Sequence, residues 1–329
     1  MKTLAQAVLI GIGSVCLALA ATSASAQVLD SAFTVQEATD TLAVFHQVVA
    51  VQTLTTGQTR QRLTDGLAVW GDDAAEVEAA PRWSAWGGAS GALYDFDDED
   101  FDGRGFSALA GIDHLLSDDF VLGFAIGYDR TAFETRLLDT PGDFDGQSYT
   151  FNFYGGWLAS EAVLVDGFLS YTRTNLDIDQ GTAAGDTTSD RASGGVGVTL
   201  SHAVGPLVVQ PRISAAIAFD SQITYFDSNG NDIENERSAL FRGTGGARIT
   251  YPLSFGDMRL RPWAEAAIEG TLDDVGDAAL LGDTFSGRFG GGMDFKISDW
   301  AISLSGGVAG IGGRDFTEFG GRLQIAYPF

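Results

Sequence analysis

Three histidines are the residues of this chain best suited to acid–base or nucleophilic chemistry. Ser201 and His202 are adjacent in the sequence, but adjacent residues of a strand point to opposite faces, so they cannot act as a local Ser–His pair. His46 falls on a predicted helix, and we expect it on the polar face of that helix. His114 and His202 each lie beside a short predicted turn. We therefore predict no catalytic residue and no enzymatic activity.

Clustered carboxylates are the second feature that could do chemistry. Asp97, Asp98 and Asp100 lie in an acidic run over residues 95–102, and oxygen ligands of this kind suit Ca²⁺. A solvated external loop accounts for the same run. Residues 227–232 partly resemble a calcium loop, but Asp232 stands where the sharp turn requires Gly. We predict no metal site and no cofactor, and the three carboxylates are the one calcium candidate.

The composition restricts the partners of the protein. The formal net charge is −25, with 44 acidic and 19 basic residues. An excess of acid this large argues against a nucleic-acid partner, because such binding depends on a basic surface. The chain is nevertheless 45% hydrophobic and contains 43 glycines and 22 phenylalanines. A soluble all-β protein and a membrane β-barrel both fit that mixture, so the arrangement of the apolar residues has to decide.

Residues 1–26 have the pattern of a secretory signal peptide. Lys2 supplies a positive start, residues 8–21 are apolar, and Ala24 and Ala26 fit the small-x-small cleavage rule. Cys16 is the only cysteine and is removed with this segment. The mature chain is then free of thiols, which fits a protein exported to the envelope of a Gram-negative bacterium.

Residues 27–82 differ from the rest of the chain. Thr34 and Glu37 form a capping box, and apolar residues then recur at helical spacing over about 35–54. Such a helix is ~30 Å long at ~1.5 Å per residue, about the depth of a bilayer core. A second, weaker helical pattern covers 59–70, and an acidic linker follows. We interpret this segment as a pore plug; a periplasmic or disordered tail is the alternative.

From residue 83 onward the hydrophobic period changes to two, which predicts strands. An even number of strands is typical of a single-chain bacterial barrel, and ten to fifteen residues can cross a bilayer when tilted. The pattern predicts twelve strands near residues 83–94, 105–115, 119–133, 148–159, 162–174, 191–202, 207–219, 237–250, 258–269, 284–297, 299–309 and 317–329.

The predicted connections alternate between long and short. The long ones cover residues 95–104, 134–147, 175–190, 220–236, 270–283 and 310–316, and they hold more than half of the 44 acidic residues. Short turns at one end and longer external loops at the other are typical of an up-and-down membrane barrel. A soluble Greek-key sandwich has no reason to alternate in this way. We therefore predict a twelve-stranded antiparallel transmembrane barrel, with the acidic rim outside the cell.

The two faces of each predicted strand separate apolar from polar residues. Strand 148–159, for example, places Tyr149, Phe151 and Phe153 opposite Ser148 and Thr150. A charge on the lipid face costs ~2–4 kcal/mol at mid-depth, so charged residues belong in the lumen. The lumen-facing residues predicted on this basis, which would set pore selectivity or hold the helix, are Arg212, Arg242, Arg248, Arg259, Arg261, Glu265, Glu269, Arg288, Asp294 and Arg322.

At this point the chain resembles the β-domain of autotransporters, the type V secretion family. The resemblance covers residues 83–329 and rests on the twelve strands, the preceding helix, the opening motif at 83–88, the hairpin at 111–128 and the terminal aromatic strand. It implies an outer-membrane barrel whose helix runs through the pore and whose passenger is displayed outside. It also implies that the last strand is recognised by the barrel-assembly machinery through Leu323, Ile325, Tyr327 and Phe329.

We therefore expect an outer-membrane translocator or anchor with little or no passenger, divided into a signal peptide (1–26), a helical linker segment (27–82) and a barrel (83–329). Residues 27–82 also lack the Asn at which some relatives cleave themselves. A freestanding pore or structural protein that exports nothing is the alternative. The expected partners are outer-membrane lipid, lipopolysaccharide and the assembly machinery, for a monomeric barrel that binds no nucleic acid.

Overall fold

The computed structural model describes most of the chain from residue 35 onward. Two compact units are distinguished, Met1–Ala32 and Phe33–Phe329, and every described residue belongs to the second. The predicted signal peptide and the calcium candidate Asp97, Asp98 and Asp100 lie outside the described residues. These comprise 35–64, 81–96, 101–137, 140–179, 184–226, 228, 230, 232–233, 237–256, 258–273, 285–312 and 316–329.

Among the described residues, twelve long strands follow one helix, α2 (Val35–Thr64). The long strands are β1 (Trp83–Phe96), β2 (Phe101–Ser117), β3 (Phe120–Leu137), β4 (Thr140–Ser160), β5 (Val163–Asp179), β6 (Ala184–Leu200), β8 (Leu207–Gln222), β11 (Arg237–Thr250), β13 (Met258–Asp273), β14 (Phe285–Ile297), β15 (Trp300–Ile311) and β16 (Phe316–Pro328). Four short strands accompany them: β7 (His202–Val204), β9 (Tyr225–Phe226), β10 (Asp232–Ile233) and β12 (Leu253–Phe255).

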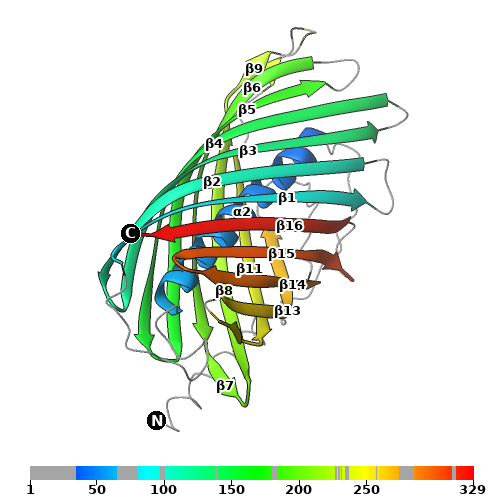
Figure 1. The fold of residues 1–329 in the computed structure, drawn as a ribbon. Coiled ribbons are helices and arrows are strands. Elements are labelled where there is room, and N and C mark those ends of the chain that lie inside the picture. Colours follow the sequence, from blue (N-terminus) through cyan, green and yellow to red (C-terminus); the bar gives the residue numbers. More distant parts are fainter. Residues whose placement is uncertain are drawn as a thin grey trace. The chain divides into compact units, whose positions relative to one another are not determined.

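The twelve long strands close into a ring (Figure 1). Each pairs antiparallel with its neighbour in the chain, and β8 connects to β11. The first and last strands complete the circle, with Ser84 opposite Pro328 and Phe96 opposite Phe316. The short strands β7 and β12 pair antiparallel with the beginnings of β8 and β13, and β9 and β10 form a separate hairpin. The predicted twelve-stranded antiparallel barrel is therefore confirmed.

The strands extend further into the predicted long loops than we expected. The predicted loops 134–147 and 175–190 are mostly strand, since β4 begins at Thr140 and β5 ends at Asp179. In these extensions the acidic residues lie between buried apolar ones, as in Leu176, Asp177 and Ile178. The period of two is therefore intact there, but apolar side chains point inward and acids outward. The boundary predictions were wrong because we took the acidic residues as loop markers.

In the middle of the barrel wall, apolar residues face outward and polar residues face inward, as predicted. Phe153 and Leu169 point outward and are 66% and 69% exposed. Their neighbours Asn152 and Ser170 point inward and are buried. An outward apolar band with an inward polar face is the pattern of a barrel that faces lipid.

The helix α2 lies inside the ring of strands (Figure 1) and is longer than predicted. It is continuous over Val35–Thr64, whereas the sequence suggested a helix to residue 54 and a separate one from 59. Thr55 and Gly57, which lie between the two predicted segments, favour helices poorly. Thr55 donates to the carbonyl of Val51 within the helix, and packing against the wall outweighs propensity. In the part of the chain that is described, no helix combines the length and hydropathy needed to cross a bilayer.

The alternation predicts the cost of a charge on the outward face. Phe153→Arg should lower the free energy of unfolding in lipid vesicles by about 2–4 kcal/mol, because Phe153 lies at mid-strand. Val204→Arg, at an exposed position beside a turn, should cost only ~0–1 kcal/mol. Urea titration monitored by tryptophan fluorescence measures both. Equal costs at the two positions would contradict the assignment of a lipid-facing band.

Candidate functional site

The lumen side chains that hold α2 form the candidate site. Phe45, Val48, Val51 and Leu54 of the helix are each at most 2% exposed. They belong to one apolar cluster with wall residues such as Phe133 of β3 and others on β4 and β5. The helix therefore has an apolar contact with one side of the barrel instead of an aqueous gap.

Gln47 makes the central polar contact between the helix and that side of the wall. Its side-chain amide donates to Thr150 Oγ1 of β4 at 2.7 Å and to the Thr172 hydroxyl of β5. Its Oε1 accepts from Arg191 Nη1 at 2.6 Å, and Arg191 Nε in turn donates to Asp220 at 2.8 Å. The polar atoms of a fully buried glutamine are thereby satisfied by three strands.

We had expected His46 on a polar face of the helix, but it is buried between the helix and the wall at 3% exposure. Its Nδ1 is hydrogen-bonded to Tyr94 Oη at 2.8 Å and its Nε2 to Ser107 Oγ at 3.0 Å. The expectation was wrong because this side of the helix faces Tyr94 of β1 and Ser107 of β2, which the sequence of the helix alone does not reveal. The other histidines lie elsewhere: His114 of β2 packs on Trp83 with ring centroids 4.3 Å apart, and His202 is exposed on β7.

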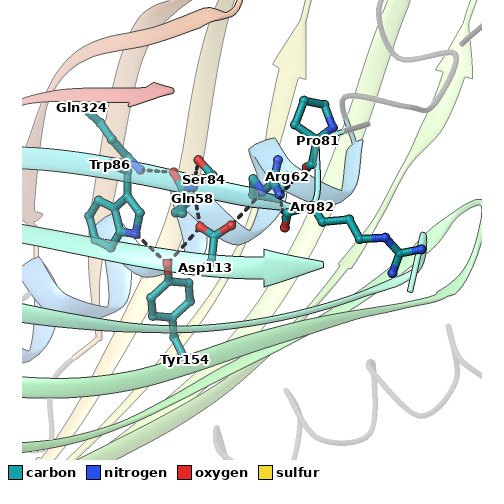
Figure 2. Close-up of polar contacts among 9 residues, drawn as sticks. All are labelled: Gln58, Arg62, Pro81, Arg82, Ser84, Trp86, Asp113, Tyr154 and Gln324. Carbon is teal, nitrogen blue, oxygen red and sulfur yellow. Dashed lines mark hydrogen bonds and ion pairs between the residues drawn. The ribbon is translucent and has the colours of Figure 1, made fainter. Parts of the chain in front are cut away.

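Near its C-terminal end the helix is anchored through Asp113 of β2 (Figure 2). Gln58 Nε2 and Arg62 Nε each donate to this carboxylate at 2.7 Å. The wall adds Tyr154 Oη, which donates to Asp113 at 3.1 Å and accepts from Trp86 Nε1 at 2.5 Å. The side chains of Arg62 and Asp113 are 8% and 0% exposed, so this is a buried ion pair with additional hydrogen bonds.

The same anchor connects the first strand of the barrel with the last. Arg62 Nη2 donates to the carbonyls of Pro81 and Arg82 at 2.9 and 3.0 Å, directly ahead of β1. Gln58 Oε1 accepts from Gln324 Nε2 of β16 at 3.2 Å, and Gln58 Nε2 also reaches Ser84 of β1 (Figure 2). One turn of helix therefore contacts the first, second and last strands.

Glycines of the wall make room for helix side chains. A Cβ added at Gly88 of β1 would lie 2.6 Å from Leu54 Cδ2, and one at Gly105 of β2 would lie 2.5 Å from the His46 ring. A Cβ at Gly156 of β4 would clash with Thr59. These three glycines let α2 approach the wall closely.

The lumen-facing residues predicted from the sequence lie on the other side of the barrel, on β8, β11, β13, β14 and β16. Two of them reach the helix: Arg212 Nη2 donates to Thr56 Oγ1 at 3.2 Å and Arg242 Nη1 to Gln52 Oε1 at 3.0 Å. Six others line or border the lumen cavity beside α2, namely Arg248, Arg261, Glu265, Glu269, Arg288 and Asp294. Arg322 lines the same cavity, and Arg259 is half-buried near one end of β13.

The Asp113 anchor was not predicted from the sequence. Gln47, Gln58 and Arg62 are spaced by 11 and 4 residues, which places them on one helix face, so their spacing was a usable signal. Asp113 has inward parity between Ile112 and His114, but an isolated acid on a strand does not identify its partner. Among the described residues, no group of three or more His, Cys, Asp or Glu is placed to hold a metal ion.

The buried ion pair predicts a large effect of removing one partner. Asp113→Ala should lower the free energy of unfolding by about 3–5 kcal/mol, because Arg62 is left as an uncompensated buried charge. Adding Arg62→Ala should then cost much less than Arg62→Ala alone, which a double-mutant cycle measures. Asp119→Asn, in an exposed turn, is the control and should change stability by ~0.5 kcal/mol or less. Additive effects of the two substitutions would contradict the pairing.

Comparison with known proteins identifies this architecture. Residues 83–305 match the family model described as the autotransporter beta-domain. No curated protein matches the sequence. Similar solved structures include the β-domain of the Bordetella autotransporter BrkA, with a TM-score of 0.65 at 15% identity over 75% of this chain and 100% of that one. The translocator domain of NalP from Neisseria meningitidis has a TM-score of 0.65 at 17% identity over 87% of this chain and 98% of that one.

The transport unit of AIDA-I from Escherichia coli also matches, with a TM-score of 0.58 at 15% identity over 84% of this chain and 99% of that one. Identities this low show the shared fold alone, whereas the family model covers more than half of the chain. The chain therefore belongs to the autotransporter β-domain family, whose barrels are translocators in the outer membrane of Gram-negative bacteria.

Proposed function

We propose that this barrel translocates and anchors the part of its own chain that precedes α2. The direction of the helix carries the proposal. His46 contacts Tyr94, which lies near the β1–β2 connection, and Phe45 packs in one cluster with Phe133 and Phe144, which lie near the β3–β4 connection. The opposite end of the helix contacts Asp113 and the carbonyls ahead of β1. The helix therefore begins toward the end of the barrel that carries the β1–β2 and β3–β4 connections. We assign this end to the cell exterior, and we infer that the chain preceding α2 emerges there.

The contacts around α2 support a role in holding the helix in place. Arg212 and Arg242 each bridge from the helix to a wall carboxylate: Arg212 Nη2 donates to Asp166 at 2.8 Å, and Arg242 Nη2 donates to Glu269 at 2.7 Å. Their charges are thus neutralised while they bind Thr56 and Gln52 of the helix. We propose that these arginines, with the Asp113 anchor, retain the helix as a plug after translocation.

We propose no catalytic step for this barrel. Ser107, His46 and Tyr94 are hydrogen-bonded in the order of a nucleophile, a base and an orienting group. Ser107 is fully buried, however, and Tyr94 is 2% exposed, which does not support access of a substrate to the hydroxyl. The supported reading is that these three residues fix the helix to β1 and β2.

We also propose export through the predicted signal peptide, residues 1–26, and recognition of β16 by the barrel-assembly machinery. Leu323, Ile325, Tyr327 and Phe329 all point outward and are between 37% and 57% exposed. Together they offer an apolar stripe at the seam, accessible from the lipid side. Lipid and lipopolysaccharide are the partners proposed for the remaining outward band.

Display of an epitope tests the translocator function. An epitope tag inserted after Gln27 should be reached by antibody and by added protease on intact cells, because the chain ahead of α2 emerges at the outer end. The same tag in the turn at Asp118–Asp119, at the other end of the barrel, is the control and should be protected until the outer membrane is permeabilised. If the tag after Gln27 is equally protected, the protein is a freestanding pore or structural barrel that exports nothing.

Conductance tests the plug. Deleting residues 28–80 should raise the single-channel conductance in planar bilayers severalfold, since α2 occupies the lumen. Gly156→Leu, which displaces Thr59 of the helix, should give a smaller increase. Gly245→Leu, at a position with open space around it, should leave the conductance unchanged. Identical conductance for the wild-type and deleted chains would show that the helix does not obstruct the pore.

A further inference from the structure

The lumen is strongly asymmetric around α2. On the side of β8, β11, β13, β14 and β16 the helix leaves a cavity of about 150 Å³. Seven arginines and two carboxylates, Glu265 and Asp294, line it. A smaller cavity of about 70 Å³ shares Glu265, Arg288 and Arg322 with the first. A chain with a net charge of −25 therefore encloses a cationic chamber.

The carboxylates in and around this chamber are already engaged by arginines. Arg248 Nη2 donates to Glu265 at 3.1 Å, and Arg261 Nη2 to Asp294 at 3.3 Å. Glu269 accepts from both Arg242 and Arg288, at 2.7 and 3.1 Å, and Asp166 is bound by Arg212. Even with Glu318, which lies beside Arg288, five carboxylates face seven arginines, so positive charge is in excess.

Arg322 of β16 is where this excess is concentrated. It points into both cavities, and its charged neighbours are Arg248, Glu265, Arg288 and Asp294. Within the part of the chain that the structure describes, its guanidinium makes no hydrogen bond or ion pair. The nearby carboxylates are bound by other arginines, and Arg248 is further fixed over the Trp263 ring at 3.7 Å. A cation held among cations in an enclosed space is costly unless an anion compensates it.

We propose that this chamber is a binding site for a small oxyanion of the phosphate or sulfate type, held by Arg322 together with Arg248 and Arg288. Guanidinium groups match tetrahedral oxyanions with pairs of parallel N–H donors, which a spherical ion such as chloride cannot exploit. The volume is many times the ~10–15 Å³ that a cavity needs to hold one water, so such an ion fits. The proposal rests on the charges of the chamber and is independent of whether the barrel translocates its chain.

Isothermal titration of the purified full chain in detergent tests the site, with sodium phosphate as the probe and sodium sulfate and sodium chloride of equal ionic strength for comparison. We expect saturable binding of phosphate and sulfate and none of chloride. Arg322→Gln should weaken phosphate binding at least about tenfold, because charge-assisted hydrogen bonds are lost. Arg173→Gln is the matched control: it removes an arginine that is exposed on the outer face of β5 and should leave the affinity unchanged.

Glu265→Gln distinguishes an anion site from a merely structural cluster. This change leaves Arg248 without its carboxylate, so phosphate should bind severalfold more tightly, whereas a general loss of structure would weaken binding. Heat-modifiable mobility in electrophoresis confirms that each variant is folded. The proposal is overturned if chloride binds as well as phosphate, if Arg322→Gln binds phosphate like the wild type, or if Glu265→Gln binds it more weakly.

Discussion

Closure of the backbone hydrogen-bond ladder is the constraint on which the rest of this structure depends. A strand surrounded by lipid has no water to bind its backbone N–H and C=O groups, so the sheet must close into a ring without an unpaired edge. The pairing of β1 with β16, from Ser84–Pro328 to Phe96–Phe316, removes the last open edge. Once the ring is closed, a period of two along each strand separates an outward apolar band from an inward polar lining. The lumen that holds α2 is a product of that closure.

The side chains that line the lumen differ between the two sides of α2. Toward β1–β5 it offers apolar side chains, hydroxyl groups and glycines, and the helix packs there as in a protein core. Toward β8–β16 it offers arginines whose charges are mostly balanced by carboxylates on neighbouring strands. The helix thus packs closely on one side, while on the other side Arg212 and Arg242 bind it next to a charged cavity. This division explains how one barrel can hold a helix firmly and still contain a cavity.

Features that repeat along the sequence could be predicted, whereas contacts between residues distant in the sequence could not. The twelve strands, and the faces of residues such as Phe153 and Asn152, follow from alternation, which is local. The strand ends could not be predicted in this way, because acidic residues such as Asp177 and Asp179 are exposed to solvent both in loops and on strands outside the lipid. The continuous helix and the burial of His46 depend on enclosure by strands far away in the sequence. The Asp113 anchor combines residues 51 and 55 positions apart, a pairing that no local pattern contains.

The position of Gln58 has a consequence for how this molecule becomes stable. Its side chain reaches Gln324 on the last strand, Ser84 on the first and Asp113 on the second. These hydrogen bonds can all form only when the seam between β1 and β16 is closed and the helix is seated. Seating and closure are therefore coupled cooperatively: each step lowers the free energy of the other. A barrel with its helix removed should be most prone to open at its own seam.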